Sequence, residues 1–189
     1  KFNKCIIDSK LLIAADGKNS KTRNIIKTPL YKKTYKESAL VVNFEHSKTH
    51  NNLAYEFFYK NGPLAILPMK KEKEFQSSMI WSNNKEFLCS LIKTDEDIFS
   101  EIIERKISNY LGKVIKIKSK QLFPLSAHLN AQFYGKKIIY IGDSAHSIHP
   151  IAGQGWNIGL RDVKNLYNLT LDFNKMGLSI FDTNFYKSY

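Results

Sequence analysis

A strand-like run that leads into a glycine-rich loop and then a helix constrains this chain more than any other feature. The run is IIYIGDSAHSIHPIAGQGWNIGLRD, residues 138–162, which starts apolar and ends with apolar residues at helical spacing. Asp143 follows the predicted strand, at the edge where open α/β sheets hold ligands. Because a carboxylate there accepts hydrogen bonds from ribose or ribityl hydroxyls, the run predicts an α/β fold with a cofactor site.

The loop before the predicted helix favours a flat, anionic ligand. Gly153 and Gly155 allow the backbone to approach such a ligand closely, and Pro150 fixes the loop beside it. The unpaired N–H groups at the helix start, around residues 153–157, stabilise negative charge. A simple turn followed by loop glycines is the alternative interpretation. The combination of Asp, Pro, Gly-Gln-Gly and Asn between strand and helix favours a cofactor site.

The pattern along the chain predicts a domain inserted within another. LLIAAD, residues 11–16, is apolar enough for a strand buried on both faces, and a second strand is expected before it. Residues 35–125 contain short β-branched and aromatic runs, typical of an antiparallel meander, with two helical patterns before a final basic strand. We therefore expect segments 1–34 and 126–189 to share one domain, and residues 35–125 to form the insert.

Composition excludes several classes of protein. The net charge is +12, but the lysines are scattered and no nucleic-acid-binding motif accompanies them, so no nucleic-acid partner is expected. Two distant cysteines argue against a disulfide scaffold, and no apolar run has the length of a membrane span. His146 and His149 follow Asp143 at three-residue intervals, which is a weak metal pattern because zinc needs a further ligand. No metal is predicted.

Two motifs in order resemble one enzyme family. GDSAHSIHPIAGQGWNIGLRD is similar to the second flavin-binding motif of FAD-dependent aromatic hydroxylases with the p-hydroxybenzoate hydroxylase fold. ADGKNSKTR, residues 15–23, resembles their D-G-x-x-S-x-x-R motif, which is implicated in FAD and NAD(P)H binding. Runs such as YKESALVVNFEH and GPLAILPM are similar to the ubiquinone-biosynthesis branch. The resemblance implies part of an FAD-binding Rossmann-like domain with an inserted antiparallel-sheet substrate domain, an α/β (α+β) fold.

The resemblance also implies roles for individual residues. Asp143 would hold the flavin ribityl chain, Pro150 would lie near the reactive ring, and the backbone of residues 155–157 would face its pyrimidine end. Asp16 and Gly17 would support the cofactor cleft from the other strand. The implied cofactor-binding residues are Asp16, Gly17, Arg23, Gly142, Asp143, Pro150, Gly153, Gln154, Gly155, Trp156 and Asn157. The sequence indicates no catalytic acid or base.

The implied activity is NAD(P)H- and FAD-dependent hydroxylation of an aromatic ring, with a polyprenylated phenol of ubiquinone biosynthesis as substrate. Such a substrate implies a cytoplasmic protein in peripheral contact with the inner membrane, and a biosynthetic complex as partner. No G-x-G-x-x-G dinucleotide loop is found, so the 189-residue chain alone is expected to be inactive and to bind FAD poorly. Two alternatives stay open. One is a related flavoprotein acting on another aromatic or isoprenoid substrate, and the other is a non-catalytic module that binds partners or anionic surfaces.

Overall fold

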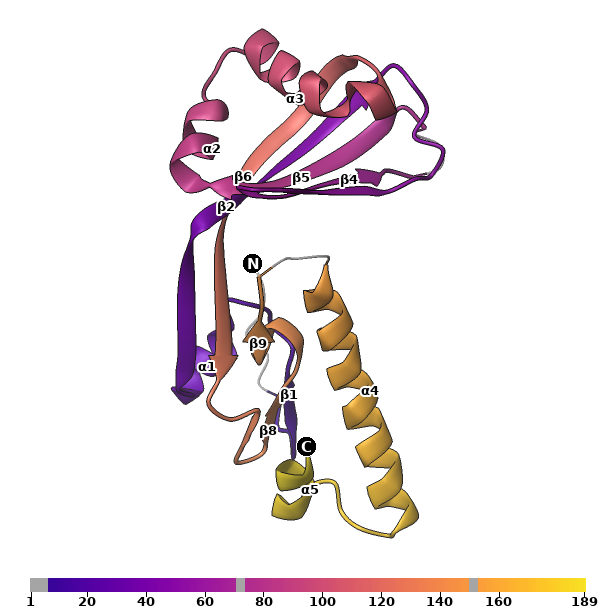
Figure 1. Ribbon diagram of the computed structural model, residues 1–189. Coiled ribbons are helices and arrows are strands. Elements are labelled where there is room, and N and C mark those ends of the chain that lie inside the picture. Colours follow the sequence, from indigo (N-terminus) through magenta and orange to yellow (C-terminus); the bar gives the residue numbers. More distant parts are fainter. Residues whose placement is uncertain (1–6, 71–73, 150–152) are drawn as a thin grey trace. The chain divides into compact units, whose positions relative to one another are not determined.

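The computed structural model describes residues 7–70, 74–149 and 153–189, and the chain divides into two compact units. The first unit comprises residues 1–33 and 126–189, and the second comprises residues 34–125. The chain passes between the units within two long strands, β2 (Leu30–His46) and β6 (Val114–Asn130), as Figure 1 shows.

The first unit contains a three-stranded sheet in the order β1-β8-β7. Strand β1 (Leu12–Ala14) runs parallel to β8 (Ile138–Tyr140), while β7 (Tyr134–Gly135) forms an antiparallel hairpin with β8. All residues of β8 are buried, which confirms the strand predicted at the apolar start of the run 138–162. Its side chains alternate: Ile139 packs with helical residues on one face, and Ile138 and Tyr140 pack with Ala14 on the other.

The prediction that the first strand run is buried on both faces is wrong for β1. Leu12 and Ile13 are 45% and 46% exposed, and only Ala14 is buried. The physical reason is that, among the described residues, β1 is paired on one side only, with β8. The additional strand expected before it falls largely on residues 1–6, outside the described part of the chain.

Three helices complete the first unit: α1 (Lys21–Ile26), α4 (Gln154–Lys175) and α5 (Thr183–Ser188). Helix α4 confirms the predicted amphipathic helix, since Leu166 and Phe173, seven residues apart, lie on its buried face. Phe173 packs edge-on against Phe185 of α5 at 5.1 Å between ring centroids. Helices α4 and α5 therefore cover the Ile139 face of the small sheet. Two short elements, η1 (Gly142–Ser144) and β9 (His146–Ser147), lie between β8 and α4 in the chain.

The second unit contains an antiparallel sheet, as the sequence predicts. Strands β3 (Tyr55–Tyr59), β4 (Gly62–Pro68) and β5 (Gln76–Asn84) form a meander, followed across the sheet by β2 and β6. The expected simple meander is wrong in one respect, because β2 lies beside β5 and not beside β3. The short turn between β3 and β4 pairs these strands with each other, and β2 pairs at the opposite side of the meander from β3, beside β5.

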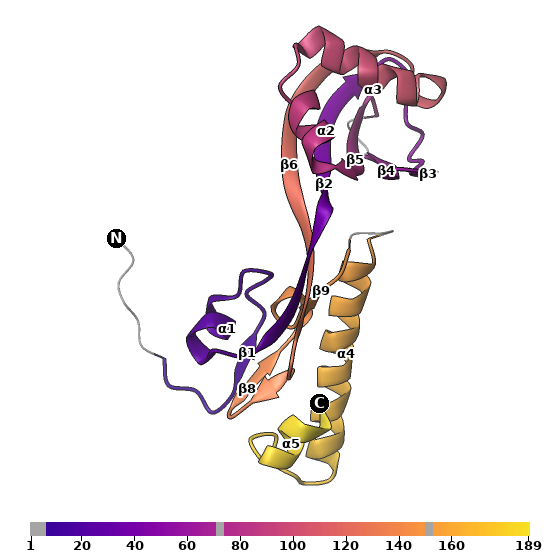
Figure 2. The same cartoon turned by 60° about the vertical axis from the view of Figure 1, so that its left-hand side comes forward.

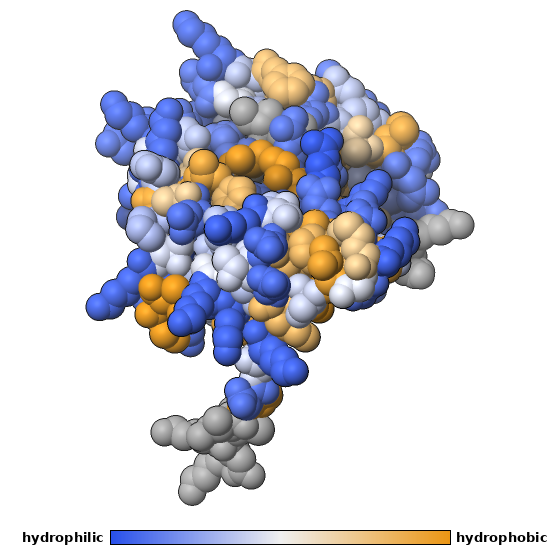
Figure 3. Space-filling view, turned by 90° about the horizontal axis from the view of Figure 1, so that it is seen from below, coloured by the Kyte–Doolittle hydropathy of each residue, from blue (hydrophilic) through white to orange (hydrophobic). Residues whose placement is uncertain are grey.

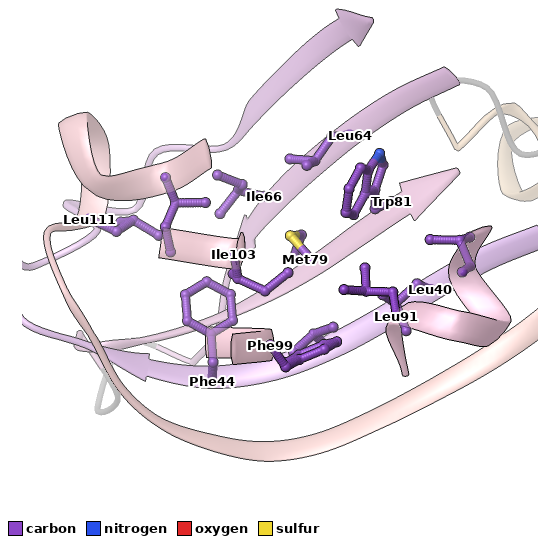
Figure 4. Packing of buried hydrophobic residues seen from close by; sticks show 13 residues of the cluster. Leu40, Phe44, Leu64, Ile66, Met79, Trp81, Leu91, Phe99, Ile103 and Leu111 are labelled. Atoms are coloured by element: carbon purple, nitrogen blue, oxygen red, sulfur yellow. The ribbon is translucent and has the colours of Figure 1, made fainter. Parts of the chain in front are cut away.

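Helices α2 (Lys85–Leu91) and α3 (Glu96–Leu111) lie over one face of this sheet (Figures 1 and 2) and confirm the two predicted helices. Helix α3 begins with acidic residues that suit the positive end of the helix dipole and ends before Gly112, as expected. Alternate strand residues face the helices and form the main core, drawn in Figure 4. This core consists of Leu40, Val42, Phe44, Leu64, Ile66, Met79, Trp81, Leu88, Leu91, Phe99, Ile103, Ile107 and Leu111.

Candidate functional site

The two sequence motifs lie at the same edge of the small sheet in the first unit. Because β1 and β8 are parallel and in register, with Ala14 opposite Tyr140, their carboxyl ends coincide. Asp16 follows the end of β1 by two residues, and Gly142 and Asp143 follow the end of β8 by two and three residues. The backbone N–H of Ile141 donates to the Ala14 carbonyl at 3.0 Å, which ties the two strand ends together. Residues far apart in sequence are thus brought to one site, where α/β sheets hold ligands.

The first motif forms a tight turn that leads into helix α1. Gly17 has a φ of 80°, a conformation that favours glycine. The Ser20 hydroxyl caps the helix by accepting from the Arg23 N–H at 2.9 Å, and Asp16 Oδ2 accepts from the Thr22 N–H at 3.0 Å. Desolvation opposes ionisation of Asp16, but hydrogen bonds from Ser20 and Thr22 lower its pKa from 3.8 to about 2. Asp16 is therefore an exposed, charged group held by its own turn.

Arg23 joins the two motifs from inside the first unit. It is 6% exposed, and its guanidinium donates to the main-chain carbonyls of Ser144 and Lys18 at 3.0 and 2.6 Å. The same Nη1 atom lies 3.1 Å from Nε2 of His128. These contacts make Arg23 a connection between the loops that follow β1 and β8.

His128, to which the sequence analysis assigns no role, belongs to this network. Its Nε2 atom lies 3.1 Å from the Asp143 carbonyl as well as 3.1 Å from Arg23. A neutral imidazole nitrogen either donates or accepts, so Nε2 makes one of these bonds at a time. Burial and the neighbouring Arg23 charge lower the pKa of His128, which favours the neutral ring. Sequence reasoning missed this residue because its partners are over 100 and 15 positions away.

Asp162 holds the loop after β8 from helix α4, and sequence reasoning did not single it out. Its Oδ2 atom accepts from the Gly142 N–H and contacts Nε2 of His146, both at 2.7 Å. Gly142 has a φ of 56°, and a Cβ built at Gly159 would meet the Gly142 Cα at 3.5 Å. The available signal was the spacing of Gly159 and Asp162, which places a small residue and an acid on one helical face.

Asp143 itself faces solvent at the centre of this arrangement. Its backbone carbonyl lies beside His128. Its side chain is exposed, and none of the described residues forms a hydrogen bond with it. A carboxylate held in this way is free to accept hydrogen bonds from ligand hydroxyls. The loop geometry therefore leaves the acid available, while Ser144 and His146 beside it are buried.

The start of helix α4 is open in the described structure. Gly153 is the N-cap residue, with a φ of 63° and no side-chain cap bond, and the first turn carries no acidic residue. A Cβ at Gly153 or Gly155 would meet no atom within 4 Å, and Trp156 is 74% exposed. Gln154 and Asn157 are exposed as well, while Pro150 lies outside the described residues. The first N–H groups of α4 are thus available to an anionic or carbonyl-bearing ligand.

Comparison with known proteins shows the family to which the chain is similar. A family model described as FAD binding domain matches residues 3–171. The ubiquinone hydroxylase UbiL of Rhodospirillum rubrum is 30% identical over 172 residues, which cover 91% of this chain and 39% of that protein. The human mitochondrial ubiquinone biosynthesis monooxygenase COQ6 is 30% identical over 192 residues, covering 84% of this chain and 40% of that protein.

A solved structure shows the same fold at low sequence identity. The probable FAD-dependent monooxygenase pqsL from Pseudomonas aeruginosa superposes with a TM-score of 0.68 and 18% identity, covering 87% of this chain and 46% of that one. The α/β fold class inferred from the sequence is thereby confirmed. The chain spans about 40% of the length of these curated relatives. The resemblance to FAD-dependent hydroxylases of the ubiquinone branch is also confirmed, and the chain belongs to the FAD-binding domain family.

Proposed function

We propose that this chain supplies part of an FAD-dependent monooxygenase that hydroxylates the aromatic ring of a polyprenylated phenol in ubiquinone biosynthesis. The observation that carries this proposal is the meeting of the two flavin motifs at one sheet edge, through the parallel register of β1 and β8. The names of the relatives UbiL and COQ6 support the substrate class.

The described residues fit the flavin group in chemistry as well as position. The exposed Asp143 carboxylate, without a described hydrogen-bond partner, would accept from ribityl hydroxyls. The unpaired N–H groups of Gly153 and Gly155 would donate to the pyrimidine end of the ring system, which the Asn157 backbone would also face. Asp16 and Gly17 would bound the cleft from the β1 side. When bound, the flavin supplies the redox chemistry, and the protein orients the substrate ring and excludes water.

Each of the other predicted cofactor residues has a proposed part. Arg23 and Gly142 would act through the loop, since Arg23 binds the Ser144 carbonyl and Gly142 donates to Asp162. Gln154 and Trp156 would border the ring, and Pro150 would lie beside it. NAD(P)H is proposed as the reductant of the flavin. The insert, residues 35–125, is proposed as the substrate domain.

A polyprenylated substrate resides in the bilayer, so we propose peripheral contact with the cytoplasmic face of the inner membrane, within a biosynthetic complex. No described helix is long and apolar enough to cross a membrane. The net charge of +12 would attract anionic lipid, at about 1 kcal/mol for each basic side chain near the surface. Figure 3 shows hydrophilic side chains spread over one face with smaller apolar groups between them.

Vesicle co-sedimentation tests the membrane proposal. We expect the full protein to bind anionic vesicles more than neutral ones, and salt to weaken this binding steeply because it screens the charges. Equal binding to both kinds of vesicle, or binding to neither, would show that the basic charge does not attract the protein to anionic membranes.

The activity itself is tested with the full protein, NADH or NADPH, oxygen and a polyprenylated phenol. The expected result is a product heavier by one oxygen atom, with incorporation of label from ¹⁸O₂. A non-prenylated phenol serves as the comparison substrate. Pyridine-nucleotide oxidation without ring hydroxylation of either phenol would contradict the proposal, and hydroxylation of the non-prenylated phenol alone would favour another aromatic substrate.

A further inference from the structure

The second unit contains a pocket that no step of the proposed function uses. It has a volume of about 450 Å³ and is lined by the β3–β4 turn, the end of β5, and one face each of α2 and α3. Three of its walls are the aromatic rings of Tyr59, Trp81 and Phe87, and Trp81 and Phe87 meet edge-on at 5.5 Å. In Figure 4, the Trp81 ring lies beside Leu64 within the core cluster, so this wall is fixed by packing.

Lys106 of α3 places a positive charge against these rings. Its Nζ atom lies 4.7 Å from the centroid of Tyr59 and 4.4 Å from that of Trp81. In the part of the chain that the structure describes, no carboxylate forms an ion pair with it. Partial burial lowers the pKa of Lys106 because desolvation disfavours the charged form. Contact with two ring faces offsets part of that cost, but ring faces do not accept the hydrogen bonds that an ammonium group donates.

The other lining groups also suit an anion. Asn83 uses its Oδ1 atom to accept from the Asn84 N–H at 2.7 Å, so its remaining hydrogen-bonding capacity lies mainly in its N–H donors. Lys60 lines the same pocket, and none of the described lining residues is acidic. A neighbouring cavity of about 530 Å³ shares Tyr59 and Lys106 and adds Arg105, whose charge is paired with Glu101 at 2.6 Å. The Arg105–Glu101 pair adds no net charge, so the positive charge at the pocket comes from Lys60 and Lys106.

From this geometry we propose that the pocket binds an aromatic carboxylate. The flat ring would lie against Tyr59, Trp81 and Phe87, and the carboxylate would pair with Lys106. The volume is ample for a single ring, since an apolar cavity of about 150 Å³ already holds benzene in another protein. All lining residues belong to the second unit, whereas the flavin motifs belong to the first. This ligand site therefore goes beyond the proposed function and is testable without turnover.

Fluorine NMR of the protein labelled with 5-fluorotryptophan tests the proposal. Benzoate is the probe, and benzamide is its neutral counterpart of nearly equal shape. We expect the Trp81 resonance, assigned through its absence in Trp81→Tyr, to shift saturably with benzoate. The Trp156 resonance in the first unit should stay in place. Benzamide should bind at least about tenfold more weakly, because it cannot form the charge-assisted bond.

Variants locate the charge that the probe uses. Lys106→Met should weaken benzoate binding by about tenfold or more, and Lys106→Arg should retain it. Lys120→Met is the matched control, because Lys120 also lies over a ring, that of Phe99 at 4.7 Å, and its loss should leave binding unchanged. Thermal unfolding shows whether each variant is folded. A Trp81 resonance that does not respond to benzoate overturns the proposal, as do equal affinities for benzoate and benzamide or unchanged binding by folded Lys106→Met.

Discussion

The two units join distant segments of the chain in different ways. In the second unit, strand pairing and an apolar core connect β2, β4, β5 and the two helices. In the first unit, the parallel pairing of β1 with β8 is supplemented by side chains bonded to main-chain carbonyls, which connect the motifs: Arg23 to Ser144, Ser144 to Ala14, and Lys18 to Ser126. Apolar packing tolerates changes of partner, whereas a hydrogen bond fixes one pair of atoms.

This difference follows from which residues each unit leaves exposed to solvent. The proposed function requires the loops after β1 and β8 to expose Asp16, Asp143 and the start of α4, and these groups are exposed, so burial of their own side chains does not hold the loops. Buried polar groups beneath them, such as Arg23 and His128, hold the backbone from behind. We therefore expect core substitutions to unfold the second unit, and polar substitutions in the first unit to disturb the flavin site selectively.

The largest effect is expected in the apolar core of the second unit. Phe99 of α3 is fully buried between this helix and the sheet. Phe99→Ala should lower the free energy of unfolding by about 4 kcal/mol, because apolar burial is lost and a cavity remains. Urea denaturation followed by circular dichroism measures this change. Phe58→Ala is the matched control, because Phe58 is 74% exposed and its truncation should cost little. Equal losses in both variants would contradict the assigned core.

A smaller loss of stability is expected when the polar connection in the first unit is cut. Arg23→Ala should lower the free energy of unfolding by about 3 kcal/mol, because the Lys18 carbonyl loses the Arg23 donor and the Ser144 carbonyl keeps only its bond from Asn130. Flavin affinity should fall with it, since both motifs lose their connection. Lys21→Ala, at an exposed position of the same helix, is the control. If Arg23→Ala has the same stability and flavin affinity as Lys21→Ala, the hydrogen bonds of Arg23 do not support the fold or the flavin site.

Sequence patterns were sufficient where local periodicity decides the structure. The helices α2, α3 and α4, the antiparallel strands and the buried strand β8 all follow from the spacing of apolar residues. The exposure of β1 was missed, because a run such as LLIAAD does not reveal how many neighbours its strand has. Asp162 and His128 were missed for a related reason, since tertiary packing between different elements brings them to their partners.

Substitution of Asp143 should change FAD affinity without changing the stability of the fold. In the full protein, Asp143→Ala should weaken FAD binding by about 2 kcal/mol, or roughly thirtyfold, because it removes a charge-assisted hydrogen bond to the ribityl chain. Global stability should change little, since the side chain is exposed. Flavin titration and urea denaturation measure the two quantities. Asp172→Ala, an exposed acid near the end of α4, controls for loss of charge. Unchanged FAD affinity in folded Asp143→Ala would remove the residue from the site.

The smallest expected effect is on the free energy of unfolding at acidic pH. Hydrogen bonds in the turn lower the pKa of folded Asp16 from 3.8 to about 2, so the charged form stabilises the fold above pH 3.8. That contribution is lost as pH falls from 3.8 through 2, because the folded state then takes up the proton as well. Since Asp16 is exposed, solvent screening reduces the contribution to about 1 kcal/mol.

Asp16→Asn tests this contribution, because it removes the charge and keeps the shape. The variant should be less stable than the unaltered protein at pH 7, and the two should converge between pH 4 and pH 2. Urea denaturation at a series of pH values gives the comparison. Asn19→Ala, in the same turn and without a titratable group, should change stability by the same amount at every pH. A constant difference for Asp16→Asn across this range would show that its bonds to Ser20 and Thr22 do not depend on its charge.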